Sequence, residues 1–320
     1  MVHHNQKSVL MYTKPVGGMT NIGDPFILKT DDMYYMYATS QPDVGFKVWQ
    51  SPNLVDWEEK GLAYSIDEQS EKWATGDFWA PEVIHYDNQY YMTYSARTVE
   101  GSLQISIARS LHPLGPFIDI KTNLIEWAGS YIDGHLFIEE DGTPYFYYVK
   151  DCSENIINGK HISQIYVQQL SRSLTECSGD AKLILEPDNE WEGIDGHFQW
   201  NEGPFLLKHQ GKYYLMYSAQ CFASPNYAIG YAVAEHPMGP FYKADENPIL
   251  AKDLAKGVSG PGHNSVTIGP DGKTLYIVYH IHTDVKKPSG NRQMCIDRLF
   301  FVDGKLKIDG PTVDQQQIQL

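Results

Sequence analysis

Five segments of this chain resemble one another, and this internal repeat constrains the fold more than any other feature. Each segment has an apolar run, a polar turn and a tyrosine-rich run, which is the pattern of a β-hairpin. The apolar runs are Asp24–Leu28, Ala80–Ile84, Asp133–Ile138, Glu202–Leu207 and His263–Ile268. The runs after the turns are Tyr34–Thr39, Tyr90–Ser95, Tyr145–Tyr148, Tyr213–Ser218 and Leu275–Tyr279. We therefore expect one supersecondary unit to occur five times.

Further strand-like segments follow two of the hairpins, at Leu103–Ser110 and Tyr227–Ala234. Both are followed by the same ending, His112–Phe117 and His236–Phe241, in which proline and glycine recur at one spacing. Each unit thus holds about four short strands, the content of one propeller blade. No amphipathic helix pattern lies between the units, which argues against a βαβ fold. We predict an all-β, five-bladed β-propeller that occupies residues 1–320 as a single domain, with a β-sandwich as the alternative.

Charge and composition exclude several classes of partner. The formal net charge of −15 disfavours nucleic acid, which needs Lys and Arg against its phosphates, and it disfavours acidic lipid surfaces. A neutral sugar is compatible with it. No apolar run reaches transmembrane length, and Met1–Asn5 lacks the hydrophobic core of a signal peptide. We expect a cytoplasmic protein, or a secreted or periplasmic one whose leader has been removed. The four cysteines form no CxxC pair, so a zinc site is not expected.

The first residues of the five units are expected to meet, because the innermost strand of every propeller blade begins near the central axis. These positions hold Asp24, Ala80–Glu82, Asp133, Glu202 and His263. Carboxylates gathered in one pocket repel one another and lose solvation, and such clusters are more often functional than structural. Glu82 lies two residues past its leading position and is expected to face away or to hold a loop. Asp195 has no hairpin after it, and we interpret it as a loop residue near the rim.

Two or three carboxylates without a metal-ligand cluster suit glycoside hydrolysis. One carboxylic acid protonates the leaving oxygen, and a carboxylate activates water or attacks directly. A third can raise the pKa of the acid, because a neighbouring like charge disfavours ionisation. Trp79, Tyr131 and Trp200 each lie just before the start of a unit. They are candidates for stacking on a sugar ring, with ordinary packing at the blade ends as the alternative.

The motifs at these positions resemble glycoside hydrolase family 43, from about Asp24 to Thr312. They are Gly23–Phe26, Trp79–Val83, Tyr131–Gly134, Asn201–Phe205 and Gly262–Ser265. The resemblance implies a five-bladed propeller with inverting chemistry. By position, Asp24 resembles the general base that activates water, Glu202 the general acid, and Asp133 the third carboxylate, which tunes and orients the acid.

Two further residues are assigned by the same resemblance. Arg292 resembles an arginine that reaches toward the substrate. His263 resembles the axial histidine of the family, which in many members faces a calcium ion or water in the central channel. His263 is therefore the candidate metal ligand, and no other cofactor is expected.

The family includes α-L-arabinofuranosidases, arabinanases, β-xylosidases and some galactosidases. Many of its β-xylosidases carry an additional C-terminal β-sandwich, whereas this sequence ends soon after the repeats. We therefore expect an exo-acting α-L-arabinofuranosidase that cleaves pentose-containing plant oligosaccharides or polysaccharides. A β-xylosidase and an endo-1,5-α-L-arabinanase are the alternatives within the family. A non-catalytic sugar-binding propeller is the alternative from another class, but it would not need three carboxylates.

Overall fold

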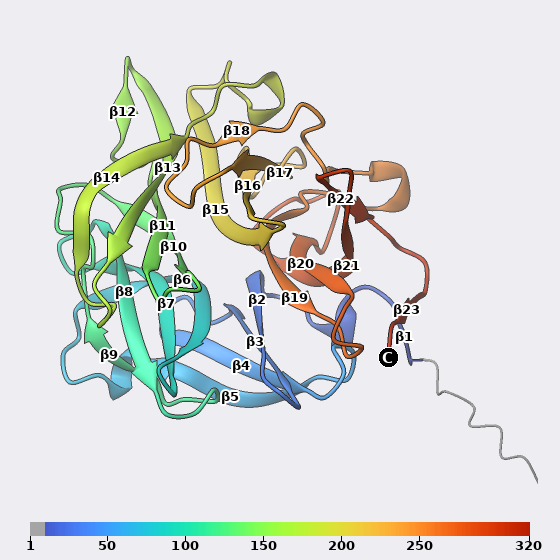
Figure 1. Ribbon diagram of the computed structural model, residues 1–320, viewed down its shortest axis with the longest axis horizontal. Coiled ribbons are helices and arrows are strands. Elements are labelled where there is room, and N and C mark those ends of the chain that lie inside the picture. The colour runs from blue at the N-terminus through green and yellow to red at the C-terminus, as the bar shows by residue number, and fades with distance from the viewer. Residues whose placement is uncertain (1–9) are drawn as a thin grey trace, which may run out of the picture.

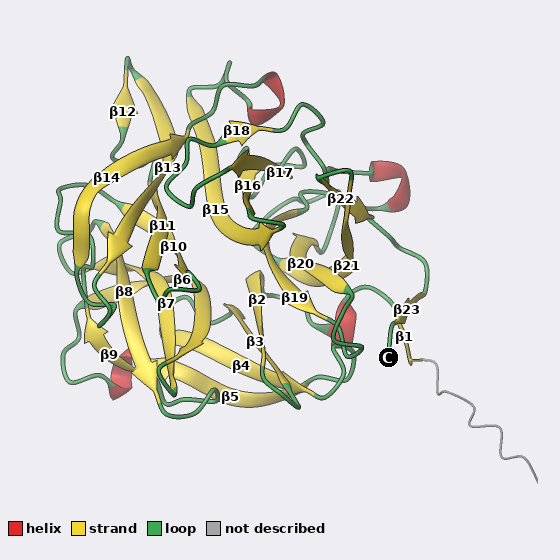
Figure 2. Cartoon of the chain, in the orientation of Figure 1, coloured by secondary structure: helices red, strands yellow, loops and turns green. Residues whose placement is uncertain are grey.

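Residues 10–320, which the computed structural model describes, consist almost entirely of strands and loops (Figure 1, Figure 2). The helices in this range are four 3-10 turns, η1 (Val16–Gly18), η2 (Ile66–Glu68), η3 (Glu190–Glu192) and η4 (Leu254–Lys256). None of them is long and apolar enough to cross a membrane. The all-β prediction is thus confirmed. Residues 1–9, to which the signal-peptide prediction refers, lie outside the described range.

The strands form five groups, each built around a four-stranded antiparallel meander. Group one is β2 (Gly23–Lys29), β3 (Tyr34–Thr39), β4 (Gly45–Ser51) and β5 (Glu58–Ser65). Group two is β6 (Ala74–Tyr86), β7 (Gln89–Thr98), β8 (Leu103–Ser110) and β9 (Ile118–Lys121). Group three is β10 (Tyr131–Ile138), β11 (Pro144–Lys150), β13 (Lys160–Leu170) and β14 (Cys177–Leu185), with the short β12 (Ile156–Ile157) beside β13.

Group four is β15 (Phe198–His209), β16 (Lys212–Ala219), β17 (Ala228–Ala234) and β18 (Tyr242–Lys243). Group five is β19 (Gly262–Ile268), β20 (Leu275–His282), β21 (Arg292–Val302) and β22 (Lys305–Asp309). The two ends of the described chain pair through β1 (Leu10–Tyr12) and β23 (Gln316–Ile318). The five hairpins predicted from the repeat are the first two strands of the five groups.

The first strands of the groups contact one another in sequence order. β2 contacts β6, β6 contacts β10, β10 contacts β15, β15 contacts β19, and β19 contacts β2 again. The order of contacts therefore returns to the group where it began. Groups three and four have an additional connection, because β13 and β15 pair in parallel and join them into one nine-stranded sheet.

Each first strand carries the same β-bulge near its start. The bulge residues with positive φ are Asp24 (54°), Ala80 (48°), Asp133 (58°), Gly203 (57°) and His263 (49°). Register shifts occur at all five places. Non-glycine residues rarely adopt this backbone conformation, and bulges that redirect side chains are common beside active sites. The equivalent residue of group four is Gly203, so the prediction that placed Glu202 at this position was off by one residue.

The bulges are tied to the preceding group by hydrogen bonds from their backbone N–H groups. The Ala80 N–H donates to Thr39 Oγ1 at 2.9 Å, and the Asp133 N–H donates to Ser95 Oγ at 3.0 Å. The His263 N–H donates to Ser218 Oγ at 2.8 Å, and the Asp24 N–H donates to His280 Nδ1 at 3.1 Å. The last of these bonds joins group five to group one, and all four hold the bulges in a fixed arrangement.

Tyrosines dominate the core between the groups, and two of them explain the repeated proline-rich endings. Tyr37 and Tyr147 are fully buried, and their hydroxyls donate to the carbonyls of Pro113 and Pro237 at 2.5 and 2.6 Å. Each ring thus fills the core, while its hydroxyl satisfies a backbone acceptor in the turn of the following group.

Candidate active site

Asp24 is surrounded by hydrogen-bond donors from groups one and five. Arg292 Nη1 donates to Asp24 Oδ1 at 2.7 Å, and Arg292 Nη2 lies 3.5 Å from Oδ2. The Thr39 hydroxyl donates to Oδ2 at 2.6 Å. His263 Nδ1 lies 3.3 Å from Oδ1, and His280 Nδ1 accepts the backbone N–H of Asp24. Asp24 itself is only 8% exposed, so these neighbours replace the water it has lost.

The charges around Asp24 favour its ionised form. Burial raises the pKa of Asp24, but the charge of Arg292, followed by His263 and the hydrogen bond from Thr39, outweighs burial and brings the pKa well below its ordinary value. Burial and the charge of Arg292 lower the pKa of His280 well below its usual range. His280 is therefore neutral, and its Nδ1 accepts a hydrogen bond. Asp24 is a carboxylate that can take up a proton.

Gly23 makes the pairing of Asp24 with Arg292 sterically feasible. A Cβ atom at Gly23 would lie 1.9 Å from Arg292 Nη2, far inside van der Waals contact. Gly262 holds the same position before the bulge in group five, where a Cβ atom would lie 2.0 Å from a ring carbon of Tyr227. Both glycines of the predicted motifs thus leave room for a side chain that contacts a carboxylate.

Glu202 and Asp133 form the other half of the cluster. The backbone N–H of Gly203 donates to Asp133 Oδ2 at 2.9 Å, and the Tyr227 hydroxyl donates to Glu202 Oε1 at 2.8 Å. Burial, and then the negative charge of Asp133, raise the pKa of Glu202 well above its ordinary value. Burial is also the largest cause that raises the pKa of Asp133, to about 6. Glu202 is therefore a carboxylic acid that can give up a proton.

The cluster thus contains carboxyl groups whose pKa values are driven apart by their surroundings. Such a separation is how one site holds an acid and a base at the same pH. Asp24, Asp133, Glu202, His263 and Arg292 are brought together as the sequence predicted. The guanidinium of Arg292 is engaged by Asp24.

The three predicted stacking residues have different surroundings. Trp79, in the middle of β6, and Trp200, near the start of β15, are both partly exposed. Tyr131 is only 3% exposed, its ring packs against Tyr148, and its hydroxyl donates to the Ala128 carbonyl. The prediction that Tyr131 stacks on a sugar is therefore wrong, because the ring belongs to the core between groups two and three.

Glu82 and Asp195, which were not expected to belong to the catalytic cluster, lie outside it. Glu82 Oε2 lies 2.7 Å from His135 Nδ1, and the other ring nitrogen of His135 accepts the backbone N–H of Leu206. Glu82 thereby links the first strands of groups two, three and four. Asp195 is exposed in the turn before β15, as predicted.

Comparison with known proteins identifies the family. The sequence matches the model of glycosyl hydrolases family 43 over residues 12–306. The chain belongs to this family. It is a glycoside hydrolase, as the motifs predicted.

Relatives and solved structures support this assignment over most of the chain. A β-D-galactofuranosidase of Aspergillus niger is 28% identical over 87% of this family-43 chain and 79% of its own length. An α-L-arabinofuranosidase of Humicola insolens is also 28% identical, over 90% of this chain, which spans 63% of that enzyme. The crystal structure of a thermostable family-43 glycoside hydrolase is 61% identical, with a TM-score of 0.94, over 95% of this chain and 98% of its own. An endo-1,4-β-xylanase structure from Bacteroides thetaiotaomicron is 32% identical, with a TM-score of 0.78, over 92% of this chain and 97% of its own.

The site of this family-43 hydrolase does not fit a calcium ion held directly by protein side chains. Residues 10–320 contain no group of three or more His, Cys, Asp or Glu side chains placed around a metal position. Calcium takes six to eight oxygen ligands. The nearest carboxylate to His263 is Asp24, whose Oδ1 is already bonded to Arg292.

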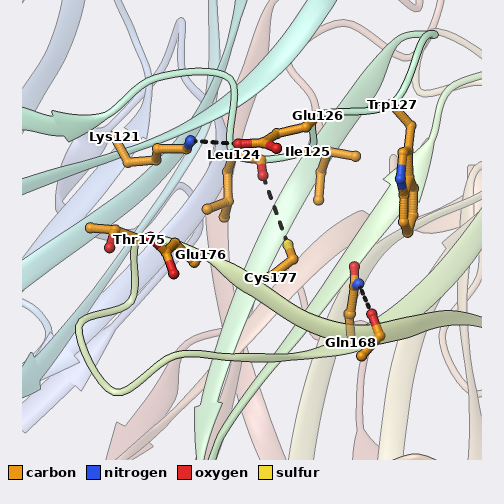
Figure 3. A pocket seen from close by; sticks show the side chains of 10 residues that line it. Lys121, Leu124, Ile125, Glu126, Trp127, Gln168, Thr175, Glu176 and Cys177 are labelled. Atoms are coloured by element: carbon orange, nitrogen blue, oxygen red, sulfur yellow. Dashed lines mark hydrogen bonds and ion pairs between the residues drawn. The ribbon is translucent and has the colours of Figure 1, made fainter.

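A cleft of about 510 Å³ lies elsewhere on the hydrolase, between β9 and β14 (Figure 3). Lys121 pairs with Glu126 at one side of it, Trp127 stands at the other, and the Cys177 thiol donates to the Leu124 carbonyl between them. None of the three carboxylates lines this cleft. The candidate active site is thus defined by its chemistry and not by this hollow.

Several residues of the site were missed in the sequence. Thr39 and Tyr227 each donate to a carboxylate, and His280 accepts the backbone of Asp24. The half-exposed Phe222 ring lies over Arg292, with 5.1 Å between ring centroid and guanidinium carbon. Thr39 could have been found, because the second runs of units one, two and four all end in a hydroxyl residue. His280 holds the equivalent position in unit five but carries no hydroxyl, and Tyr227 and Phe222 have no such repeat signal.

Proposed function

We propose that the five strand groups are the blades of a five-bladed β-propeller, which forms one catalytic domain. The cyclic order of first-strand contacts and the bond from Asp24 to His280 support this arrangement. The five equivalent bulges support it too, because they direct residues from different groups toward one buried cluster.

The proposed reaction is hydrolysis of a glycosidic bond by a single displacement with inversion. Asp24 takes a proton from a water molecule while the oxygen of that water attacks the anomeric carbon. Glu202 gives its proton to the glycosidic oxygen as the bond from that oxygen to the anomeric carbon breaks. Asp133 keeps Glu202 protonated through its charge. The observation that carries this proposal is the buried cluster in which Arg292 pairs with Asp24, while Glu202 faces a second carboxylate.

The proposed substrate is a terminal α-L-arabinofuranosyl unit of a plant oligosaccharide or polysaccharide. Named relatives include the Humicola insolens enzyme and an exo-α-(1->5)-L-arabinofuranosidase of Streptomyces avermitilis, which is 25% identical. The net charge of −15 favours a neutral sugar over nucleic acid or an acidic membrane surface. A β-xylosidase is the second candidate, supported by a relative of that name from Xylanibacter ruminicola, and an endo-arabinanase is the third, supported by one from Thermotoga petrophila.

Hydrolysis of nitrophenyl α-L-arabinofuranoside and nitrophenyl β-D-xyloside, side by side, tests the substrate. NMR of the first-formed product anomer tests inversion. Glu202→Gln should lower turnover by about 10²- to 10⁴-fold, the usual contribution of a general acid. The matched control is Glu235→Gln, an exposed glutamate paired with Lys212. Equal activity of both variants would refute the assignment of the acid, and a retained anomer would refute inversion. Cleavage of neither glycoside, with cleavage of linear arabinan, would favour the endo-acting alternative.

A further inference from the structure

One face of β15 leads from Glu202 to the exterior of the molecule. Side chains alternate between the faces of a strand, so Phe198, Trp200 and Glu202 share one face. Burial follows this alternation, because Phe198 is 44% exposed and Trp200 is partly exposed, whereas Gln199 and Asn201 are buried. The proposed acid therefore stands at the inner end of a line whose outer members are two aromatic rings.

A third ring extends this line across the connection between groups three and four. In the parallel pairing of β13 with β15, His161 is the register partner of Phe198. The His161 and Phe198 rings stack with 4.4 Å between centroids and 24° between planes. Phe198 and Trp200 are 6.0 Å apart, at 18°. The three near-parallel rings form an aromatic row, defined here as His161, Phe198 and Trp200.

The row is held rigidly at its outer end. The His161 backbone N–H donates to the His197 carbonyl at 2.9 Å, and the His161 Nδ1 lies 2.8 Å from the Cys152 carbonyl. A carbonyl accepts only, so Nδ1 carries a hydrogen, and in the neutral ring Nε2 is an acceptor. The described residues supply no partner for Nε2. The outer end of the row thus combines an apolar ring surface with an acceptor for a hydroxyl group.

We infer that the aromatic row is a subsite for the leaving-group side of a pentose oligosaccharide. This inference rests on the proposed function, in which Glu202 protonates the glycosidic oxygen and the leaving sugar therefore lies on the side of Glu202. Sugar rings have apolar faces that pack on aromatic rings and hydroxyls that need polar partners. The row supplies both, directly beside the acid. Trp200 contacts the first sugar after the cleaved bond, and Phe198 and His161 contact the next ones.

The subsite makes the leaving group part of the specificity. A nitrophenyl glycoside ends beside Trp200 and does not reach Phe198 or His161. An oligosaccharide of four pentoses does reach them. The register of the β13–β15 pairing places these rings, and β13 itself begins in the β12–β13 hairpin of group three, which projects from the molecule in Figure 1.

The test compares Phe198→Ala and His161→Ala with a matched control, Phe300→Ala, on two kinds of substrate. Phe300 is equally exposed, at 44%, but lies on β21 in group five. The kcat/KM for arabinotetraose or xylotetraose, whichever is cleaved, should fall about 2- to 10-fold for each ring removed. The kcat/KM for the nitrophenyl glycoside and the melting temperature should stay at the control value. Equal losses on both substrates, or no loss on the tetrasaccharide, would overturn the subsite.

Binding separates this inference from the proposed function. Calorimetric titration of the Glu202→Gln protein with each tetrasaccharide needs no turnover. Phe198→Ala and Phe300→Ala are each added to the Glu202→Gln protein. Weaker tetrasaccharide binding after Phe198→Ala, with binding unchanged after Phe300→Ala, supports the subsite even where the nitrophenyl glycosides are not cleaved. Equal tetrasaccharide affinity in the Glu202→Gln protein and its two double variants, or no binding to the Glu202→Gln protein itself, overturns the subsite.

Discussion

Replacing Arg292 by glutamine tests the electrostatic account of the proposed base. Arg292 Nη1 and Nη2 lie 2.7 and 3.5 Å from the two oxygens of Asp24, so the charge centres are about 4 Å apart. Unit charges at that distance attract by about 4 kcal/mol at an effective dielectric constant of about 20. One pKa unit corresponds to about 1.4 kcal/mol, so Arg292 accounts for up to about 3 units of the lowered pKa of Asp24.

The sign of the effect follows from which form of Asp24 is active. Asp24 must be ionised to take up a proton, so activity falls as the pH drops through its pKa. Loss of Arg292 raises that pKa, and the acidic limb of the kcat/KM profile should move upward by about 1 to 3 pH units as water enters the site. The assay is hydrolysis of the cleaved nitrophenyl glycoside from the lowest pH at which both proteins stay folded up to pH 8. Arg298→Gln is the control, because this exposed arginine lies on the same strand and pairs with Asp309.

Folding must be checked beside activity. Removing one member of a buried ion pair commonly destabilises a protein by about 3–5 kcal/mol. Arg292→Lys retains a positive charge and should move the acidic limb less than Arg292→Gln does. A folded Arg292→Gln protein with the parent acidic limb would refute the claim that this pair keeps the base ionised.

Three further changes have distinct expected results. Asp133→Asn removes the charge that helps to raise the pKa of Glu202, so the basic limb of the pH profile should move to lower pH; an unchanged basic limb would contradict the proposal that Asp133 tunes Glu202. Tyr227→Phe removes a hydrogen bond that lowers the pKa of Glu202, so the same limb should move upward, and a downward shift would reverse our interpretation. Gly23→Ala should displace Arg292 and lower kcat/KM at least about 10-fold, while Gly290→Ala, where a Cβ has open space, should not; equal kcat/KM values would show that the close approach is unimportant.

The repeat made the strands predictable, because alternation of apolar and tyrosine residues is a local property of the sequence. The convergence of Asp24, Asp133 and Glu202 followed from equivalent positions in that repeat. The one-residue offset of Glu202 could not be read in this way, because Gly203, and not Glu202, adopts the left-handed bulge conformation. Proline follows Asp24, Ala80 and Gly203 alike, and this spacing was the available signal.

Contacts between distant segments were the part that the sequence did not reveal. Arg292 and His280 reach Asp24 across 268 and 256 residues, and no local pattern marks either contact. Tyr131 was misjudged for a related reason. Its position before a leading residue suggested exposure, but the packing of groups two and three encloses its ring.

The bond from Asp24 to His280, and the ion pair beside it, have a consequence for how activity arises during synthesis. Asp24 belongs to the first strand group to leave the ribosome, and its arginine to the last. A nascent chain can therefore complete four groups, with Asp133 and Glu202 in place, while the proposed base Asp24 still lacks the partners that keep it ionised. Catalysis then begins only when the last group joins the first. With Asp24 as the proposed base, turnover therefore reports whether groups one and five have met.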